Sequence, residues 1–181
     1  MFIEKIKNIE VDIEKIKGDL SWVLSQTQWA PENQIGLTYR MNTENNKWKD
    51  CVGSLYDKEK KIELVREEEF TELNEFTPEY TKTVLNQLAQ QEGFKLGRVR
   101  YMLLESKRGL TVHHDTSVRY HLVIETNPYA YMAQTVTNPI MKAVCYHIPA
   151  DGFFYCVDTK KEHFVFNGGT EPRIHIVICP L

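Results

Sequence analysis

The sequence predicts a mainly β fold of the α+β class, a double-stranded β-helix (jelly-roll, cupin-like) with N-terminal helices packed on one sheet. Two observations predict it. Helical periodicity is confined to the first half of the chain, and from Arg98 onward short β-rich runs follow one another, separated mostly by turn residues. Many short strands at this rhythm are typical of a sandwich or barrel, and preceding helices would brace one sheet.

The size of the chain favours one folding unit. Its 181 residues fit a single domain over residues 1–181, in which we expect 1–96 to be a helical and strand support region and 97–181 the β-helix core. A domain of this size buries roughly 70% of the surface of its unfolded chain, so it needs no metal or disulfide for a core. The sequence ends just after the last predicted strand, so we expect no C-terminal substrate domain.

Composition argues against several classes of partner. The net charge is −3 and no stripe of Lys and Arg stands out, which argues against nucleic-acid binding. No run approaches the ~20 apolar residues of a membrane span, and the N-terminus lacks the apolar core of a secretory signal. The spacing of the cysteines matches no zinc site or disulfide framework, which predicts reduced thiols. We therefore expect a cytoplasmic protein with no membrane partner.

Two helices are predicted in the first half. Apolar residues recur at helical spacing over 10–26. A second helix would begin with Thr77 as N-cap and Pro78 at the first helical position, and would end at Gly93. Between them, Gln34–Met41 alternates as a strand does.

Seven β-rich runs fill the second half. Gly, Pro, Asn and Asp separate most of them, as expected for tight turns. The runs are Arg98–Leu104, Leu110–Asp115, Val118–Glu125, Lys142–Ile148, Phe153–Val157, His163–Phe166 and Arg173–Cys179.

Three of these runs carry a potential metal site. Side chains alternate faces along a strand, so His113 and Asp115 would point the same way and His114 the other. His163 opens a later run. Two imidazoles and one carboxylate on one face of an ion form the facial triad of non-heme Fe(II) oxygenases. The alternative is a partly exposed histidine pair beside a turn aspartate.

Arginines near these residues predict anion binding. Arg173 would lie near His163 if the last two strands paired antiparallel, and could hold the far carboxylate of a 2-oxo acid. Arg119 and His121 share one face of their strand. A buried arginine needs an anion, so Arg119 should face a substrate or cosubstrate carboxylate or, alternatively, form a salt bridge to an acid such as Glu125. His175 shares a face with Arg173, either supporting the site or as a structural histidine.

Two motifs carry a family resemblance. The blocks "H-x-D…R-x-H-L" and "H-x-x-x-N…R" begin at His113 and His163, and a further similar stretch is Gly97–Met102. Together they resemble the aspartyl/asparaginyl β-hydroxylase family of 2-oxoglutarate/Fe(II) oxygenases over roughly Gly97 to Cys179. Bacterial free-proline hydroxylases are similar in the same two blocks.

The resemblance implies roles for six residues. It makes His113, Asp115 and His163 the iron ligands. It makes Arg173 the partner of the distal carboxylate of 2-oxoglutarate, His121 a second cosubstrate contact, and Arg119 a residue near the substrate carboxylate. The sequence departs from the family twice. Animal β-hydroxylases have glycine at the position of Asp115, so the aspartate in this sequence favours the proline-hydroxylase-like branch. Met102 stands where a cosubstrate-binding serine is expected.

The function implied is that of a dioxygenase using Fe(II), 2-oxoglutarate and O2. It would hydroxylate an amino acid, or an Asp, Asn or Pro residue in a peptide. Arg119, with Arg98 or Arg100, suggests a substrate that bears a carboxylate. Two alternatives stay open: a cupin-type metal enzyme that does not use 2-oxoglutarate, and a non-catalytic jelly-roll that binds a sugar or peptide.

Overall fold

The chain forms two compact units. The computed structural model describes residues 1–57, 59–137 and 141–181. The first unit contains Met1–Ile13 and Leu103–Ile176, and the second contains Glu14–Met102 and Val177–Leu181. The expectation of one domain, divided between residues 96 and 97, stays a prediction.

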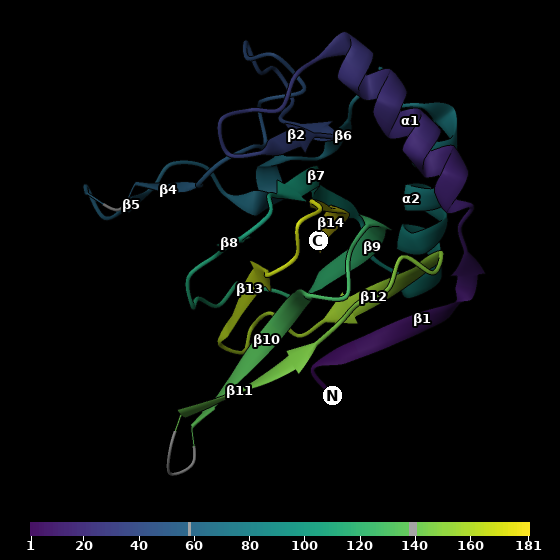
Figure 1. Cartoon of the computed structure of the whole chain (residues 1–181). Coiled ribbons are helices and arrows are strands. Elements are labelled where there is room, and N and C mark those ends of the chain that lie inside the picture. Colours follow the sequence, from purple (N-terminus) through teal and green to yellow (C-terminus); the bar gives the residue numbers. More distant parts are fainter. Residues whose placement is uncertain (58, 138–140) are drawn as a thin grey trace. The chain divides into compact units, whose positions relative to one another are not determined.

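The first unit is built on two antiparallel sheets. In the major sheet, β1 (Ile3–Glu10), β12 (Phe153–Val157), β9 (Arg119–Glu125) and the beginning of β14 (Arg173–Pro180) lie side by side in that order. The minor sheet has the order β11 (Met141–Tyr146), β10 (Ala130–Thr137), β13 (His163–Asn167) and β8 (Arg108–Gly109). Figure 1 shows these strands by their labels.

A shared core joins the two sheets. Its buried members come from β9 and β12 of the major sheet, from β10 and β13 of the minor sheet, and from flanking segments. Tyr155 and Val157, two residues apart on β12, both face it, as the two-residue period of a strand requires. The jelly-roll class predicted from the sequence is therefore confirmed. The core residues are Phe2, Val123, Met132, Ile148, Tyr155, Val157 and Val165.

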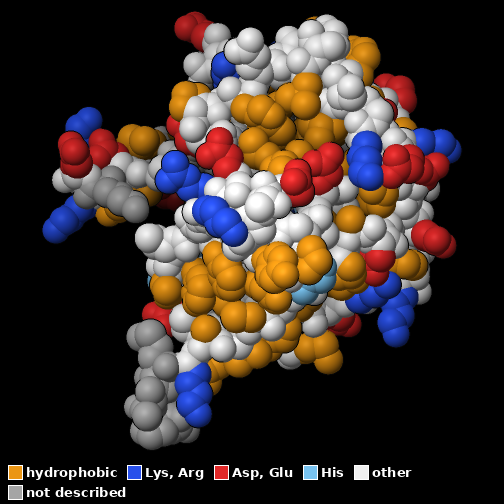
Figure 2. Space-filling model, in the orientation of Figure 1, with side chains coloured by type: hydrophobic (Ala, Val, Ile, Leu, Met, Phe, Trp, Pro, Cys, Tyr) orange, Lys and Arg blue, Asp and Glu red, His pale blue; other side chains and the backbone are white. Residues whose placement is uncertain are grey.

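The outer face of the minor sheet is partly apolar. Tyr131 and Phe166 have ring centroids 5.3 Å apart, and Phe164 stacks on Phe166 at 5.9 Å. All three side chains are half-buried. Figure 2 shows hydrophobic side chains gathered on the face it presents. This sheet therefore lacks the clean division into an apolar inner face and a polar outer face.

The second unit contains the helices. α1 (Ile13–Gln26) and α2 (Glu79–Glu92) are joined by a carboxylate, because Asp19 accepts hydrogen bonds from the backbone N–H and hydroxyl of Thr81. The Thr81 hydroxyl lies 3.5 Å from that of Tyr101, a fully buried residue of β7 (Leu96–Leu104). α2 thus covers β7, as expected for a helical brace.

Short elements complete the second unit. β7 pairs antiparallel with β2, and two further two-stranded pairs are β3 with β6 and β4 with β5. Neither described helix is long and apolar enough to cross a membrane. The short elements are β2 (Gln34–Gly36), β3 (Thr38–Tyr39), β4 (Tyr56–Asp57), β5 (Ile62–Glu63), the 3-10 helix η1 (Glu67–Glu69) and β6 (Glu72–Leu73).

Helix boundaries differ slightly from the prediction. α1 begins at Ile13 because the residues before it form strand β1, which the sequence did not indicate. α2 begins at Glu79 with Pro78 as its N-cap, since Pro78 has an extended ψ of 145°. Gly93 ends α2 with a positive φ of 73°, as predicted.

Two strand predictions were wrong. Leu110–Asp115 is not a strand: β8 ends before it at Gly109, and His113 forms an isolated bridge with His163. Its apolar residues Leu110 and Val112 are about half exposed, at 46% and 51%, so they do not contribute to the core. The predicted strand Gln34–Met41 is divided into β2 and β3. β10 was missed altogether, although it is the centre of the minor sheet.

A buried carboxylate organises the loop after β3. Asp50 accepts hydrogen bonds from the backbone and guanidinium of Arg40, from the Thr43 hydroxyl and from the Asn45 amide. Burial by itself would raise the pKa of Asp50, but these hydrogen bonds, led by those from Arg40, hold it well below its usual value. A carboxylate so placed stabilises the fold only while it is ionised.

We expect Asp50→Asn to lower the free energy of unfolding at pH 7 by roughly 2–4 kcal/mol, because it removes the charge but keeps the volume. The folded-state pKa is lowered, so this stabilisation is present above the unfolded pKa of about 3.9 and declines as the pH falls further. Urea titrations at pH 7 and pH 3 should show that the difference in the free energy of unfolding between wild type and Asp50→Asn is smaller at pH 3. Glu44→Gln, at an exposed carboxylate of the same loop, is the control, and an equal loss in both variants would contradict the account.

Candidate active site

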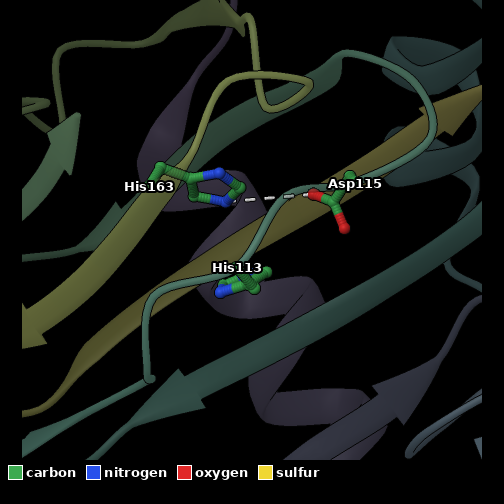
Figure 3. Close-up of side chains that lie close together, drawn as sticks. All are labelled: His113, Asp115 and His163. Carbon is green, nitrogen blue, oxygen red and sulfur yellow. Dashed lines mark ion pairs between the residues drawn. The ribbon is translucent and has the colours of Figure 1, made fainter. Parts of the chain in front are cut away.

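Three potential metal ligands converge in the first unit. One ligand atom each from His113, Asp115 and His163 all lie within 4.8 Å of one another (Figure 3). The Asp115 Oδ2 to His163 Nε2 distance is 3.9 Å, and the two imidazole centroids are 4.3 Å apart. Ligand atoms that share one ion at about 2.1 Å are about 3–4 Å apart, so the cluster is close to coordination geometry.

Main-chain hydrogen bonds hold the ligands together. The N–H of His113 donates to the carbonyl of His163 at 2.9 Å, and the N–H of His163 donates back at 2.8 Å. The N–H of Asp115 donates to the carbonyl of Thr159 at 2.8 Å. The segment carrying His113 and Asp115 is thus fixed to the start of β13, although it forms no strand of its own.

Both imidazoles present the same nitrogen. His113 Nδ1 lies 2.7 Å from the carbonyl oxygen of Thr111, and His163 Nδ1 lies 2.9 Å from that of Lys161. Since a carbonyl only accepts, each Nδ1 carries the proton and each Nε2 keeps a lone pair for a metal. Burial lowers the pKa of His163 below its usual value, which favours the neutral, ligating ring. The donor set therefore fits a divalent ion.

Arg119 contacts one of these ligands. Its guanidinium lies 3.4 Å from Asp115 Oδ1, and it also donates to the Ser117 hydroxyl. Asp115 therefore directs one oxygen to His163 and the other to Arg119. The arginine is buried, at 5% exposure. The acid it contacts is a proposed metal ligand, so its predicted place near a substrate carboxylate stays a prediction.

Arg173 is a buried cation in the same unit. Its guanidinium donates to His175 Nδ1 at 3.0 Å, and His121 Nδ1 lies 3.2 Å from the same atom. Burial lowers the pKa of Arg173 to about 10, so it stays charged at neutral pH. Among residues 1–57, 59–137 and 141–181, no carboxylate forms a salt bridge with it. A buried charge without a counter-ion is costly, which indicates an anionic ligand.

The predicted pairing of the last two strands was wrong. β13 pairs with β10 and β8, whereas β14 lies beside β9 in the other sheet. The chain changes sheets at the turn after Asn167, whose amide donates to the carbonyls of Leu104, Glu105 and Glu171. His163 and Arg173 therefore belong to facing sheets of the jelly-roll and not to one hairpin.

Two residues of this region were missed or undervalued. Phe2 packs beside the ligands, with its ring 6.4 Å from that of His163 and 5.4 Å from that of Tyr146. No signal in the sequence marked it, because β1 was not predicted. His175 was left between a supporting and a structural role, yet it contacts both Arg173 and His121.

The remaining polar candidates lie in other settings. His114 is exposed, as its predicted outward orientation requires. In the second unit, Arg98 donates to the carbonyls of Cys51 and Gly53, and Arg100 donates to the side-chain oxygen of Gln34. Arg98 is thus engaged with backbone carbonyls, and among the described residues neither arginine has a contact that indicates a substrate role.

The family model of aspartyl/asparaginyl β-hydroxylases matches residues 10–179. The chain belongs to this family. It is accordingly a hydroxylase of the Fe(II)- and 2-oxoglutarate-dependent dioxygenases, with Fe(II) as its cofactor and 2-oxoglutarate and O2 as cosubstrates. The resemblance drawn from the two sequence motifs is confirmed, and the match extends well upstream of Gly97.

Solved structures share the fold at low identity. AviO1 from Streptomyces viridochromogenes Tue57 aligns over 97% of this chain and 87% of its own, with 11% identity and a TM-score of 0.58. HygX from Streptomyces hygroscopicus, solved with nickel and 2-oxoglutarate bound, aligns over 98% and 81%, with 8% identity and a TM-score of 0.55. At these identities the likeness concerns the fold alone.

Two other comparisons add no further support. An oxidoreductase of the 2OG-Fe(II) oxygenase family from Burkholderia pseudomallei aligns over only 56% of either chain, with a TM-score of 0.43. No curated protein sequence matches the chain.

The cluster predicts how single substitutions change metal binding. We expect His113→Ala or His163→Ala to weaken Mn(II) binding by about 100-fold or more, since loss of even an outer partner of a ligand costs 10–100-fold. Calorimetric titration under anaerobic conditions measures this. His114→Ala is the matched control and should bind as the wild type does. If His114→Ala were the damaging variant, the assignment of the ligands would be wrong.

Proposed function

We propose that this dioxygenase hydroxylates an amino acid, either free or as an Asp, Asn or Pro residue in a peptide. In this proposal His113, Asp115 and His163 bind Fe(II), and Arg173 with His121 binds 2-oxoglutarate. The observation that carries it is the presence, in one unit, of a three-ligand cluster within 4.8 Å and a buried arginine that has no carboxylate partner among the described residues.

The metal and cosubstrate together supply the oxidising chemistry. When bound, they allow O2 to convert 2-oxoglutarate to succinate and CO2. One atom of O2 enters succinate, and the other is inserted into a C–H bond of the substrate. The protein contributes orientation, charge and exclusion of water. HygX, which has this fold, was solved with nickel and 2-oxoglutarate bound, and this supports a similar pair of ligands here.

The ligands are oriented before metal arrives. The carbonyls of Thr111 and Lys161 direct the Nε2 lone pairs of His113 and His163 toward the cluster. Arg119 is close to one oxygen of Asp115, which leaves the other for the metal. Three protein ligands leave open positions on an ion, which chelation by a 2-oxo acid and O2 require.

Arg173 is suited to the distal carboxylate of 2-oxoglutarate. A guanidinium presents its N–H donors in a fixed plane that matches a carboxylate, and the contact is strong when buried. The bound anion would also neutralise the charge that Arg173 carries in the core. Phe2 places an apolar ring beside His163, which would help to exclude water from the neighbouring cluster.

The nature of the substrate is supported by two features. Aspartyl/asparaginyl β-hydroxylases, by their name, act on acidic or amide side chains, and the chain belongs to that family. Arg119 lies beside Asp115, so a substrate carboxylate that it attracted would be held close to the metal ligands. A free amino acid and an Asp residue in a peptide both supply such a carboxylate, whereas an Asn or Pro residue in a peptide rests on the family alone.

A succinate-release assay tests the activity. With Fe(II) and 2-oxoglutarate, a panel of free amino acids and Asp-, Asn- or Pro-containing peptides should include at least one that stimulates succinate formation. Oxidation without any need for 2-oxoglutarate would favour a cupin-type enzyme of another kind. A protein that binds no divalent metal after reconstitution would favour a non-catalytic binding module.

Removal of the buried arginine should raise the KM for 2-oxoglutarate. We expect Arg173→Leu to lose roughly 2–5 kcal/mol of cosubstrate binding, about 30-fold to several thousand-fold in KM, because the distal carboxylate would lose its charged partner. Arg108→Leu, at an exposed arginine of the same unit, is the control. An unchanged KM in Arg173→Leu would remove the arginine from the cosubstrate site.

A further inference from the structure

His175 lies at the centre of a buried polar group on β14. It is two residues after Arg173 and so shares its face of the strand. Its side chain is almost completely buried, at 1% exposure, and its neighbours Arg173 and His121 are 8% and 5% exposed. Arg173 and His121 thus both meet His175 in the interior of the first unit, where His175 Nδ1 is the common atom.

The contact with Arg173 defines the protonation of His175. A guanidinium can only donate, so His175 Nδ1, 3.0 Å away, must accept through its lone pair. The ring proton is therefore on Nε2 and the ring is neutral. Burial, with the charge of Arg173 as a further cause, lowers the pKa of His175 well below its usual value, in agreement with this assignment.

The contact with His121 then follows. His121 Nδ1 lies 3.2 Å from the same acceptor atom, and the two rings meet edge to face at 82°. Because His175 Nδ1 has no proton, His121 must donate from its own Nδ1. One lone pair on His175 therefore orients both the guanidinium of Arg173 and the ring of His121.

We propose that His175 is a positioning residue, a neutral imidazole that holds Arg173 and His121 in the geometry needed to bind the dicarboxylate cosubstrate. This inference rests on the proposed function of those two residues. His175 Nε2 is buried and has no hydrogen-bond partner in the part of the chain that the structure describes. An unsatisfied buried N–H is unfavourable, so the site also keeps one donor for an acceptor outside the protein.

Two substitutions separate positioning from simple packing. His175→Leu removes the acceptor, whereas His175→Asn offers a side-chain oxygen near the position of Nδ1. With Ni(II)-loaded protein, we expect the Kd for 2-oxoglutarate to rise about tenfold or more in His175→Leu and to return to within about threefold of wild type in His175→Asn. Affinity for Ni(II) itself should not change in either variant. His114→Leu, at an exposed histidine, is the control.

The protonation of His175 is tested in the wild-type protein alone. In metal-free protein, ¹⁵N NMR of the histidine rings should show His175 with a bare Nδ1 and a protonated Nε2. A proton on Nδ1, a cationic ring, or equal 2-oxoglutarate affinity in wild type and His175→Leu would overturn the inference while the proposed function stands. A wild-type protein that binds Ni(II) but no 2-oxoglutarate would overturn both.

Discussion

The candidate active site depends on one pair of hydrogen bonds, the reciprocal main-chain contacts between His113 and His163. Each residue donates to and accepts from the other, so the segment around His113 has the spacing of a strand pair at that one position. The N–H of Leu110 ties the start of this segment to the carbonyl of Val165 on β13, and the bridge fixes the segment at the point where the two imidazoles meet. Because the bridge involves backbone atoms of two ligand residues, it sets the spacing of their imidazoles, and Asp115 is added through its own bond to the loop before β13.

Charge burial is the second constraint. The first unit places arginines 119 and 173 at 5% and 8% exposure, but it compensates them differently. Arg119 lies beside the carboxylate of Asp115, whereas Arg173 contacts only neutral histidine among its described partners. Buried charge without a counter-ion opposes folding, so this arrangement is best explained by an anion that binds after folding. If 2-oxoglutarate is that anion, as we propose, its binding to Arg173 would also stabilise the folded protein.

The sequence predicted the fold class and the members of the cluster, but not the way they meet. The prediction of His113, Asp115 and His163 rested on residue type and order. It therefore did not depend on a correct prediction of the secondary structure around them. Their segment was predicted as one of several short β-rich runs, yet its apolar side chains Leu110 and Val112 are about half exposed and contribute nothing to the core. The partner of β13 and the contacts of His175 depend on pairing between distant strands, which local periodicity does not encode. β1 and β10 were missed for the same reason, since their stability comes from neighbours in the sheet.

The central claim is that His113, Asp115 and His163 bind a single divalent ion. Anomalous diffraction from crystals grown anaerobically with Mn(II) tests it most directly. The account predicts one strong peak bonded to Nε2 of both histidines and to the Asp115 carboxylate, at about 2.0–2.2 Å from each. A peak elsewhere in the chain, or bonds through Nδ1 of either histidine, would contradict it.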